Sequence, residues 1–281
     1  MFYIEKNDKP NIIERQFKII KKKENTIYLP ITEKTTEKQI EKIAKRTTKI
    51  IQKHSKSKKV ILSKEMKKEQ LYTNWLNINQ IQISDGAFLF ELLIPQIIEY
   101  IINKKNFEAK SEISVLVNDI TDIELENIKE LSRKYKNINI ITNHIEKFKK
   151  IENELNRREG IILAITNNKK RSLAKSQIIV NIDFPDELIN KYNIKEDAII
   201  INVKQKVKIN KKRFNGTCIN DYEVDYKKEL KEDERNKNNK YCLKDIYESE
   251  LYRKQRVKNL KEKIRKDKVT IKKVYTNNSE I

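Results

Sequence analysis

Short apolar runs alternate with longer amphipathic segments between residues 113 and 203. The apolar runs are rich in β-branched residues and each leads into polar residues; they cover residues 113–117, 138–142, 161–165, 177–182 and 198–203. Most of the segments between them have the length and apolar spacing of helices. This alternation is typical of a parallel sheet that is covered by helices on both faces. The central part is therefore predicted to be an α/β fold with a doubly wound, mostly parallel sheet.

The N-terminal part shows a similar alternation. Residues 11–20 and 26–31 have β-leaning patterns that predict a hairpin or a pair of edge strands, and further strands are predicted at 59–63 and 81–86. Helical spacing is found at residues 32–54, 64–76 and 87–103, and the last of these is apolar on most faces, so we expect it to be buried. The first hundred residues are thus predicted to form an N-terminal α/β half, either as a separate small domain or as an extension of the same sheet.

The pattern changes after residue 203. A last short strand is predicted at 207–209, residues 225–240 are almost entirely charged or Asn, and 245–268 have helical spacing with an irregular apolar face. The residues from 275 are expected to fray. The predicted division is an N-terminal α/β region (1–105), a Rossmann-like domain (106–224), and a charged linker with a basic helical tail (225–281).

Three local motifs in the central part resemble the nucleotide-binding domain of the Rossmann superfamily. They are Asn-Ile-Ile-Thr-Asn-His-Ile-Glu-Lys-Phe-Lys-Lys-Ile at 139–151, Lys-Ser-Gln-Ile-Ile-Val-Asn-Ile-Asp at 175–183, and Ile-Lys-Glu-Asp-Ala-Ile-Ile-Ile-Asn-Val at 194–203. Within that superfamily they are most similar to the shikimate dehydrogenase and methylenetetrahydrofolate dehydrogenase type. The resemblance covers about a third of the chain. It implies a dinucleotide-binding sheet and, as one expectation, a divergent NAD(P)-dependent oxidoreductase.

The turn after the first central strand departs from that resemblance. The family needs a glycine-rich turn whose bare backbone approaches the pyrophosphate, whereas this turn reads Asn-Asp-Ile-Thr-Asp at 118–122. Asp119 and Asp122 stand where the pyrophosphate would lie, and each close like-charge contact costs on the order of a few kcal/mol. Asp122 is instead predicted to cap the following helix. No cofactor is therefore predicted, and NAD(P) binding is disfavoured.

Polar residues follow several of the predicted strands, at the edge where α/β sheets bind their ligands. The candidate cleft consists of Asn118, Asp119, Asn143, His144, Asp183 and Pro185. Four of these residues have a structural alternative. Asn143 could cap a helix with His144 exposed in its first turn, and Asp183 to Pro185 could form a strand-to-helix turn with Pro185 at the first helical position.

The net charge of +21 comes from 62 basic and 41 acidic residues, and the surplus lies at the two ends of the chain. Residues 113–204 carry 16 basic and 14 acidic residues, while 251–274 carry 11 and 2. A lysine-rich nucleic-acid-binding protein is one interpretation, because a basic helix can contact phosphates without reading sequence. Its candidate residues are Arg253, Lys254, Arg256, Lys261, Arg265 and Lys266. The alternatives are a solvated helix face and a Lys-rich, Gly-poor composition without functional meaning.

Catalytic and metal-binding patterns are not recognisable in the sequence. The two histidines, His54 and His144, lie far apart in sequence, and Cys218 and Cys242 have no disulfide or metal-ligand spacing. The most apolar stretch, 88–102, is shorter than the ~20 residues that a membrane span needs. The favoured hypothesis is a non-catalytic, cytoplasmic Rossmann-like protein that binds a small molecule or a protein partner at the carboxyl edge of its sheet. No membrane is predicted as a partner. An enzymatic role stays open.

Overall fold

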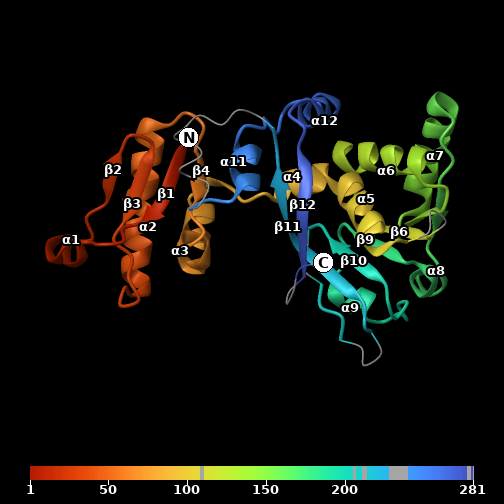
Figure 1. Cartoon of the computed structure of the whole chain (residues 1–281), viewed down its shortest axis with the longest axis horizontal. Coiled ribbons are helices and arrows are strands. Elements are labelled where there is room, and N and C mark those ends of the chain that lie inside the picture. Colours follow the sequence, from red (N-terminus) through yellow and green to blue (C-terminus); the bar gives the residue numbers. More distant parts are fainter. Residues whose placement is uncertain (108–110, 205–206, 211–213, 228–239, 277–279, 281) are drawn as a thin grey trace. The chain divides into compact units, whose positions relative to one another are not determined.

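The chain folds into two compact units (Figure 1). The computed structural model describes residues 1–107, 111–204, 207–210, 214–227, 240–276 and 280. The first unit contains residues 1–88 and 228–254, and the second contains residues 89–227 and 255–281.

The first unit is built on a five-stranded sheet with the strand order β2-β3-β1-β4-β5. Strand β2 pairs antiparallel with β3, and the other neighbours are parallel. The strands are β1 (Phe2–Lys6), β2 (Lys21–Lys23), β3 (Thr26–Leu29), β4 (Lys59–Leu62) and β5 (Gln82–Ser84). The predicted strands at 26–31, 59–63 and 81–86 are confirmed.

The helices of the first unit differ from the prediction in two places. They are α1 (Ile12–Phe17), α2 (Glu37–His54), the short 3-10 helix η1 (Met66–Lys68), α3 (Gln70–Ile78) and α11 (Leu243–Ser249). The β-leaning prediction for 11–20 is wrong, because Asn11 and Glu14 form a capping box that starts α1. The single helix predicted at 64–76 is divided between η1 and α3, where Glu69 leaves helical geometry.

The second unit contains a seven-stranded sheet with the order β12-β11-β10-β9-β6-β7-β8. Its strands are β6 (Ile113–Leu116), β7 (Ile138–Ile141), β8 (Ala164–Thr166), β9 (Ile178–Asn181), β10 (Ile199–Asn202), β11 (Thr217–Asp225) and β12 (Thr270–Thr276). All neighbours are parallel except β12, which runs antiparallel to β11. Numbered from β6, the parallel strands have the order 3-2-1-4-5-6 of doubly wound nucleotide-binding sheets. The predicted fold class is confirmed.

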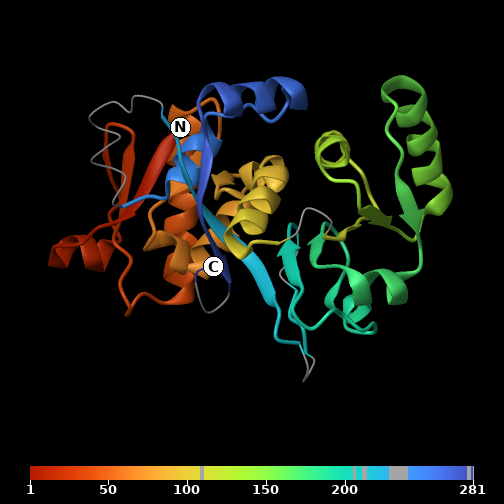
Figure 2. The ribbon, with the colours of Figure 1, turned by 45° about the vertical axis from the view of Figure 1, so that its right-hand side comes forward.

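Helices cover both faces of this sheet. Figure 2 shows α6 (Asp122–Lys134) and α7 (Ile145–Glu159) on one face, and α8 (Lys169–Lys175) and α9 (Asp186–Ile189) on the other. On the face of α8 and α9, an apolar cluster joins both helices to β6, β7, β9 and β10. The second unit also contains α5 (Ile94–Lys105) and α12 (Val257–Lys266), and α4 (Ala87–Leu92) begins at the boundary between the units.

The structure divides the chain at other residues than the sequence suggests. The apolar helix predicted at 87–103 is two helices, α4 and α5, and α5 belongs to the second unit. The basic helical tail is also not one element: α11 packs in the first unit, while α12 and β12 belong to the second. The long strand pair β11 and β12 was not predicted, and residues 207–209 are not a strand. Most of the predicted linker at 225–240 lies outside the described residues.

In the part of the chain that the structure describes, no helix is both long and apolar enough to cross a membrane.

The core of the first unit can be tested with a matched pair of substitutions. Ile43 on α2 is completely buried, whereas Ile78 at the end of α3 is 66% exposed. We expect Ile43→Ala to lower the free energy of unfolding by about 2–5 kcal/mol through lost burial and a residual cavity. Ile78→Ala should change it by less than about 0.5 kcal/mol. Urea unfolding followed by the emission of Trp75, which packs against the same core, measures both. Equal losses in the two variants would contradict this assignment of the core.

Candidate functional site

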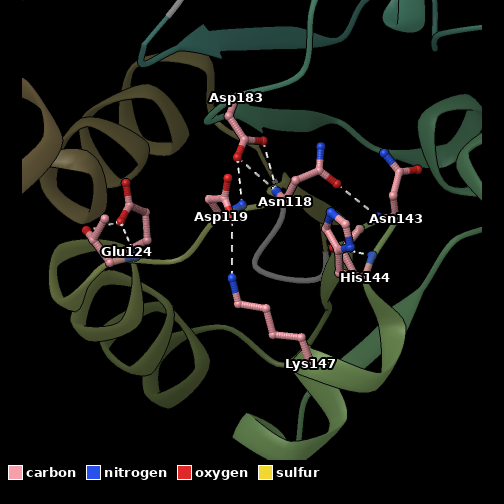
Figure 3. Close-up of polar contacts among 9 residues, drawn as sticks. Asn118, Asp119, Glu124, Asn143, His144, Lys147 and Asp183 are labelled. Carbon is pink, nitrogen blue, oxygen red and sulfur yellow. Dashed lines mark hydrogen bonds and ion pairs between the residues drawn. The ribbon is translucent and has the colours of Figure 1, made fainter.

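The carboxyl edge of the second sheet brings together residues that are far apart in sequence. Strands β6 and β9 are neighbours in the middle of the sheet, and this is the switch point at which the strand order reverses. Asn118 and Asp119 follow β6, Asn143 and His144 follow β7, and Asp183 follows β9. Figure 3 shows these residues around the loop that leads from β6 to α6. The structure thus places five of the six predicted cleft residues around one loop.

The Asp183 carboxylate is bonded to the backbone of that loop. The amide of Asn118 donates to both carboxylate oxygens, at 2.9 and 3.0 Å, and the amide of Asp119 donates to Oδ2 at 2.8 Å (Figure 3). In dinucleotide-binding sheets the backbone amides after the first strand face the pyrophosphate. Here an internal anion satisfies these amides.

Two further contacts hold the loop in place. The backbone amide of Asn143 donates to Oδ1 of Asn118 at 3.0 Å, which connects the ends of β6 and β7. The Lys147 ammonium lies 3.3 Å from Asp119 Oδ1, although the Asp119 side chain is still 86% exposed. The contact with Lys147 is therefore a surface ion pair of small energetic value, whereas the amide bonds fix the backbone.

The start of α6 is capped by a different residue than predicted. Thr121 has extended backbone geometry and is the N-cap, and Asp122 is the first helical residue. Glu124 accepts the Thr121 amide at 2.8 Å, which makes a Thr-x-x-Glu capping box. The prediction that Asp122 caps the helix is wrong because the box needs a hydroxyl three residues before Glu124. The carboxylate of Asp122 in the first turn still suits the helix dipole.

Glu124 is itself a buried carboxylate with a cationic partner. Its side chain is 2% exposed, and Lys204 Nζ lies 2.9 Å from Oε1. Burial by itself would raise the pKa of Glu124, but the hydrogen bonds from Lys204 and Thr121 outweigh burial and hold the pKa below its usual range. Glu124 is therefore a structural anion that anchors α6 beside the site.

Two helices at this edge begin one residue later than the structural alternatives for the cleft residues suggested. The N-cap of α7 is His144, not Asn143, and its side chain makes no capping bond. The His144 amide donates to Thr142 Oγ1 at 3.1 Å, and both Asn143 and His144 are exposed. Pro185 is the extended residue before α9, not its first helical residue, and it is also exposed.

The carboxyl edge presents side chains that accept hydrogen bonds. Asp119 and Asp183 contribute carboxylates, and Asn143 contributes an exposed amide. In the described residues, no group of three His, Cys, Asp or Glu side chains is placed to hold a metal ion. The arrangement suits a cationic or hydrogen-bond-donating group better than a phosphate.

The basic residues proposed for nucleic acid do not lie on one helix. Arg253 and Lys254 precede α12 and belong to the first unit, where Arg253 lies 3.2 Å from Glu248 and 4.9 Å from the ring centre of Phe88. The others belong to the second unit: Arg256 is the N-cap of α12, and Lys261, Arg265 and Lys266 are within it. The prediction of one basic helix over 245–268 is wrong, because the chain leaves helical geometry between α11 and α12.

Two of these cations have acidic partners within the second unit. Lys261 is buried and lies 2.6 Å from Glu130, and Arg265 lies 3.6 Å from the same carboxylate. Burial lowers the pKa of Lys261, and the Glu130 carboxylate opposes this effect without cancelling it. Lys261 is a packing residue of α12 against α6 and has little surface to offer a phosphate backbone.

Sequence reasoning named Asp183 as a ligand contact and missed its bond to the loop amides. It also missed Thr121, Glu124 and Lys147. The Thr-x-x-Glu spacing before an apolar helical pattern was a readable signal for the first two. Lys147 carries no sequence signal, since its position beside Asp119 depends on the pairing of β6 with β7.

Comparisons with known proteins show no family for this chain. No protein-family model matches the sequence, and neither does any protein with a curated description. Among solved structures, it is similar to a mitochondrial ornithine carbamoyltransferase from Coccidioides immitis, with 10% identity, coverage of 63% of each chain and a TM-score of 0.30. A putative aspartate carbamoyltransferase from Trypanosoma cruzi matches with 11% identity, coverage of 72% of this chain and 68% of that one, and a TM-score of 0.25. Likenesses at this level carry no argument about function.

The bond between Asp183 and the loop predicts a loss of stability on truncation. We expect Asp183→Ala to lower the free energy of unfolding by about 1–3 kcal/mol, because the amides of Asn118 and Asp119 lose a charged acceptor. Amide hydrogen exchange at both residues should become faster. Glu187→Ala, an exposed acid on α9, serves as the control and should stay within about 0.5 kcal/mol of the unmodified protein. Unchanged exchange in Asp183→Ala would contradict the bonds.

Glu124 predicts a pH dependence whose sign is fixed by its lowered pKa. A carboxylate with a lower pKa in the folded state stabilises the protein above its unfolded-state pKa, and this contribution is lost as the pH falls through the folded-state pKa. We expect Glu124→Gln to cost about 1–2 kcal/mol at neutral pH, since Lys204 loses its charged partner. The difference from the unmodified protein should shrink on acidification. Urea unfolding at several pH values measures it, and a difference that grows toward acid pH would contradict the ion pair.

Proposed function

We propose that this chain is a non-catalytic, Rossmann-like binding protein that holds a small molecule or a protein partner at the carboxyl edge of its second sheet. The observation that carries the proposal is the Asp183 carboxylate on the amides of Asn118 and Asp119. The fold's phosphate position is filled by the protein's own anion. A cytoplasmic location is part of the proposal and is supported by two free cysteines, Cys218 and Cys242.

A dinucleotide is a poor ligand for this edge. Its pyrophosphate would have to displace the Asp183 carboxylate and then lie next to it and to Asp119. A like charge beside the partly buried Asp183 costs on the order of a few kcal/mol, whereas the largely exposed Asp119 adds about 1 kcal/mol or less. The three family-like motifs fall on β7 with α7, on β9 and on β10. The proposal therefore includes a relation between this sheet and the sheets of the shikimate dehydrogenase and methylenetetrahydrofolate dehydrogenase type. It does not include binding of their cofactor.

The exposed acceptors favour a ligand or partner with donor groups. Asp119 is largely exposed beside Lys147. Asn143, whose backbone amide donates to the neighbouring Asn118, is exposed, and so is His144. An amine or a guanidinium could replace Lys147 at Asp119 while it also contacts the Asn143 side chain. A protein partner would supply the same chemistry through a lysine or an arginine.

Nucleic-acid binding is the rival function, and an oxidoreductase is the second rival. The pairing of Lys261 and Arg265 with Glu130 weighs against nucleic acid, because those cations already have an anion. The rival predicts retention on DNA or RNA that falls steeply with salt. It also predicts that this retention disappears when residues 251–281 are removed. An oxidoreductase would require NAD(P) binding at the carboxyl edge.

Titrations with three probes, agmatine, NADH and NADPH, test the proposed site against cofactor binding. We expect agmatine, which carries an amine and a guanidine, to shift the amide signals of Asn118, Asp119 and Asn143 in an NMR spectrum. NADH and NADPH should give no saturable change in the micromolar range. Asp119→Asn should weaken agmatine binding, and Glu187→Gln, which removes an exposed acid elsewhere in the unit, should leave it unchanged.

Two outcomes would contradict the proposed function. Micromolar NADH or NADPH binding with shifts at Asn118 and Asp119 would establish the cofactor mode and favour the oxidoreductase. Salt-sensitive retention on nucleic acid that depends on residues 251–281, together with no agmatine effect at the carboxyl edge, would favour the nucleic-acid rival.

A further inference from the structure

We propose that the second unit has another binding site, in a hollow beneath α8, and that it binds a phosphorylated polyol. The hollow has a volume of about 460 Å³, which is within the range of small-molecule sites. It is lined by residues before β6 and β7, on β7 and β8, and on or just before α8: Glu112, Lys136, Asn137, Ile138, Asn139, Ala164, Thr166, Asn168, Arg171, Ser172 and Lys175. None of these residues belongs to the carboxyl-edge site.

The hollow results from the local fold. Helix α8 has seven residues and therefore spans only roughly 10 Å, so it covers part of the sheet face beneath it. Ala164 on the edge strand β8 has a small side chain that leaves the space beside α8 open. Next to the lining residue Lys175, the buried hydroxyl of Ser176 is hydrogen-bonded to that of Ser114 on β6 at 2.5 Å, which joins the end of α8 to the sheet.

Three exposed cations line the hollow: Lys136, Arg171 and Lys175. Within the described part of the chain, their side chains form no ion pair, whereas Lys129 and Lys204 of the same unit each have one. Among the described residues that line the hollow, the one acid is Glu112, and it accepts a hydrogen bond from Asn139 Nδ2 at 2.6 Å. The lining therefore carries three positive charges and one negative charge. A dianion placed among them would balance the local charge.

The lining residues point to the class of anion. Lysine and the planar guanidinium of arginine are the usual partners of phosphate oxygens. The described residues that line the hollow include no aromatic side chain on which a nucleobase could stack. The hydroxyl of Thr166, the amide of Asn168 and the Glu112 carboxylate instead suit the hydroxyl groups of a sugar or another polyol. These features together favour a phosphorylated polyol.

The test uses glucose 6-phosphate as the probe, with glucose as the uncharged control, on the full chain. We expect glucose 6-phosphate to shift the amide signals of Asn139, Thr166 and Ser172 in an NMR titration, and glucose to bind at least about tenfold more weakly. The triple variant Lys136→Ala, Arg171→Ala, Lys175→Ala should weaken binding of the phosphate by at least about tenfold.

A matched control excludes an effect of net charge. Lys149, Lys150 and Arg157 are exposed cations on α7, and their replacement by Ala removes the same charge from the same unit. This control variant should bind glucose 6-phosphate within about twofold of the unmodified protein. Circular dichroism establishes that both triple variants remain folded.

The proposal is overturned by equal weakening in the two triple variants, by no binding of glucose 6-phosphate, or by glucose that binds as tightly as its phosphate. Shifts at Asn118 and Asp119 in place of those beneath α8 would also overturn it. Because the two sites share no residues, failure here leaves the agmatine result at the carboxyl edge untouched, and the converse also holds.

Discussion

The contact between the Asp183 carboxylate and the amides of Asn118 and Asp119 is the interaction on which the second unit's edge depends. It joins the ends of β6 and β9, the two central strands between which a doubly wound sheet opens. Hydrogen bonds to a charged acceptor are about twice as strong as neutral ones. One side chain thus fixes the backbone of the loop and also fills the position where the fold ordinarily receives a phosphate. The turn itself, residues 118–122, contains no glycine.

Other carboxylates of the second unit also have partners within the protein. Buried Glu124 is paired with Lys204, and Glu130 receives both Lys261 and Arg265. Lys261 packs α12 against α6, and each of these cations has an acidic partner. The three cations beneath α8 have no such partner in the described chain, and this makes the hollow electrostatically different from the salt-bridged helices. A net charge of +21 is therefore a poor guide to function until each cation is placed.

A shared sheet does not carry a shared chemistry. The strand order 3-2-1-4-5-6 is the one on which dinucleotide-binding proteins are built, but function lies in the residues at its edge. Here that edge presents carboxylates and amides, and its own anion occupies the amides. The proposed functions at the carboxyl edge and beneath α8 follow from this chemistry and not from the fold.

The sequence by itself determined the strands of the central sheet, because runs such as 113–117 and 177–182 are apolar on both faces and can only be buried between helices. It also determined that the turn after β6 lacks glycine. Tertiary structure decided the features that depend on contacts between residues far apart in sequence. Strands β11 and β12 exist because they pair with each other across some fifty residues, and the helix predicted over 245–268 is broken because α11 and α12 pack in different units. The partner of the Asp183 carboxylate and the three cations beneath α8 were likewise beyond the sequence, since only strand pairing brings residues from different loops to one place.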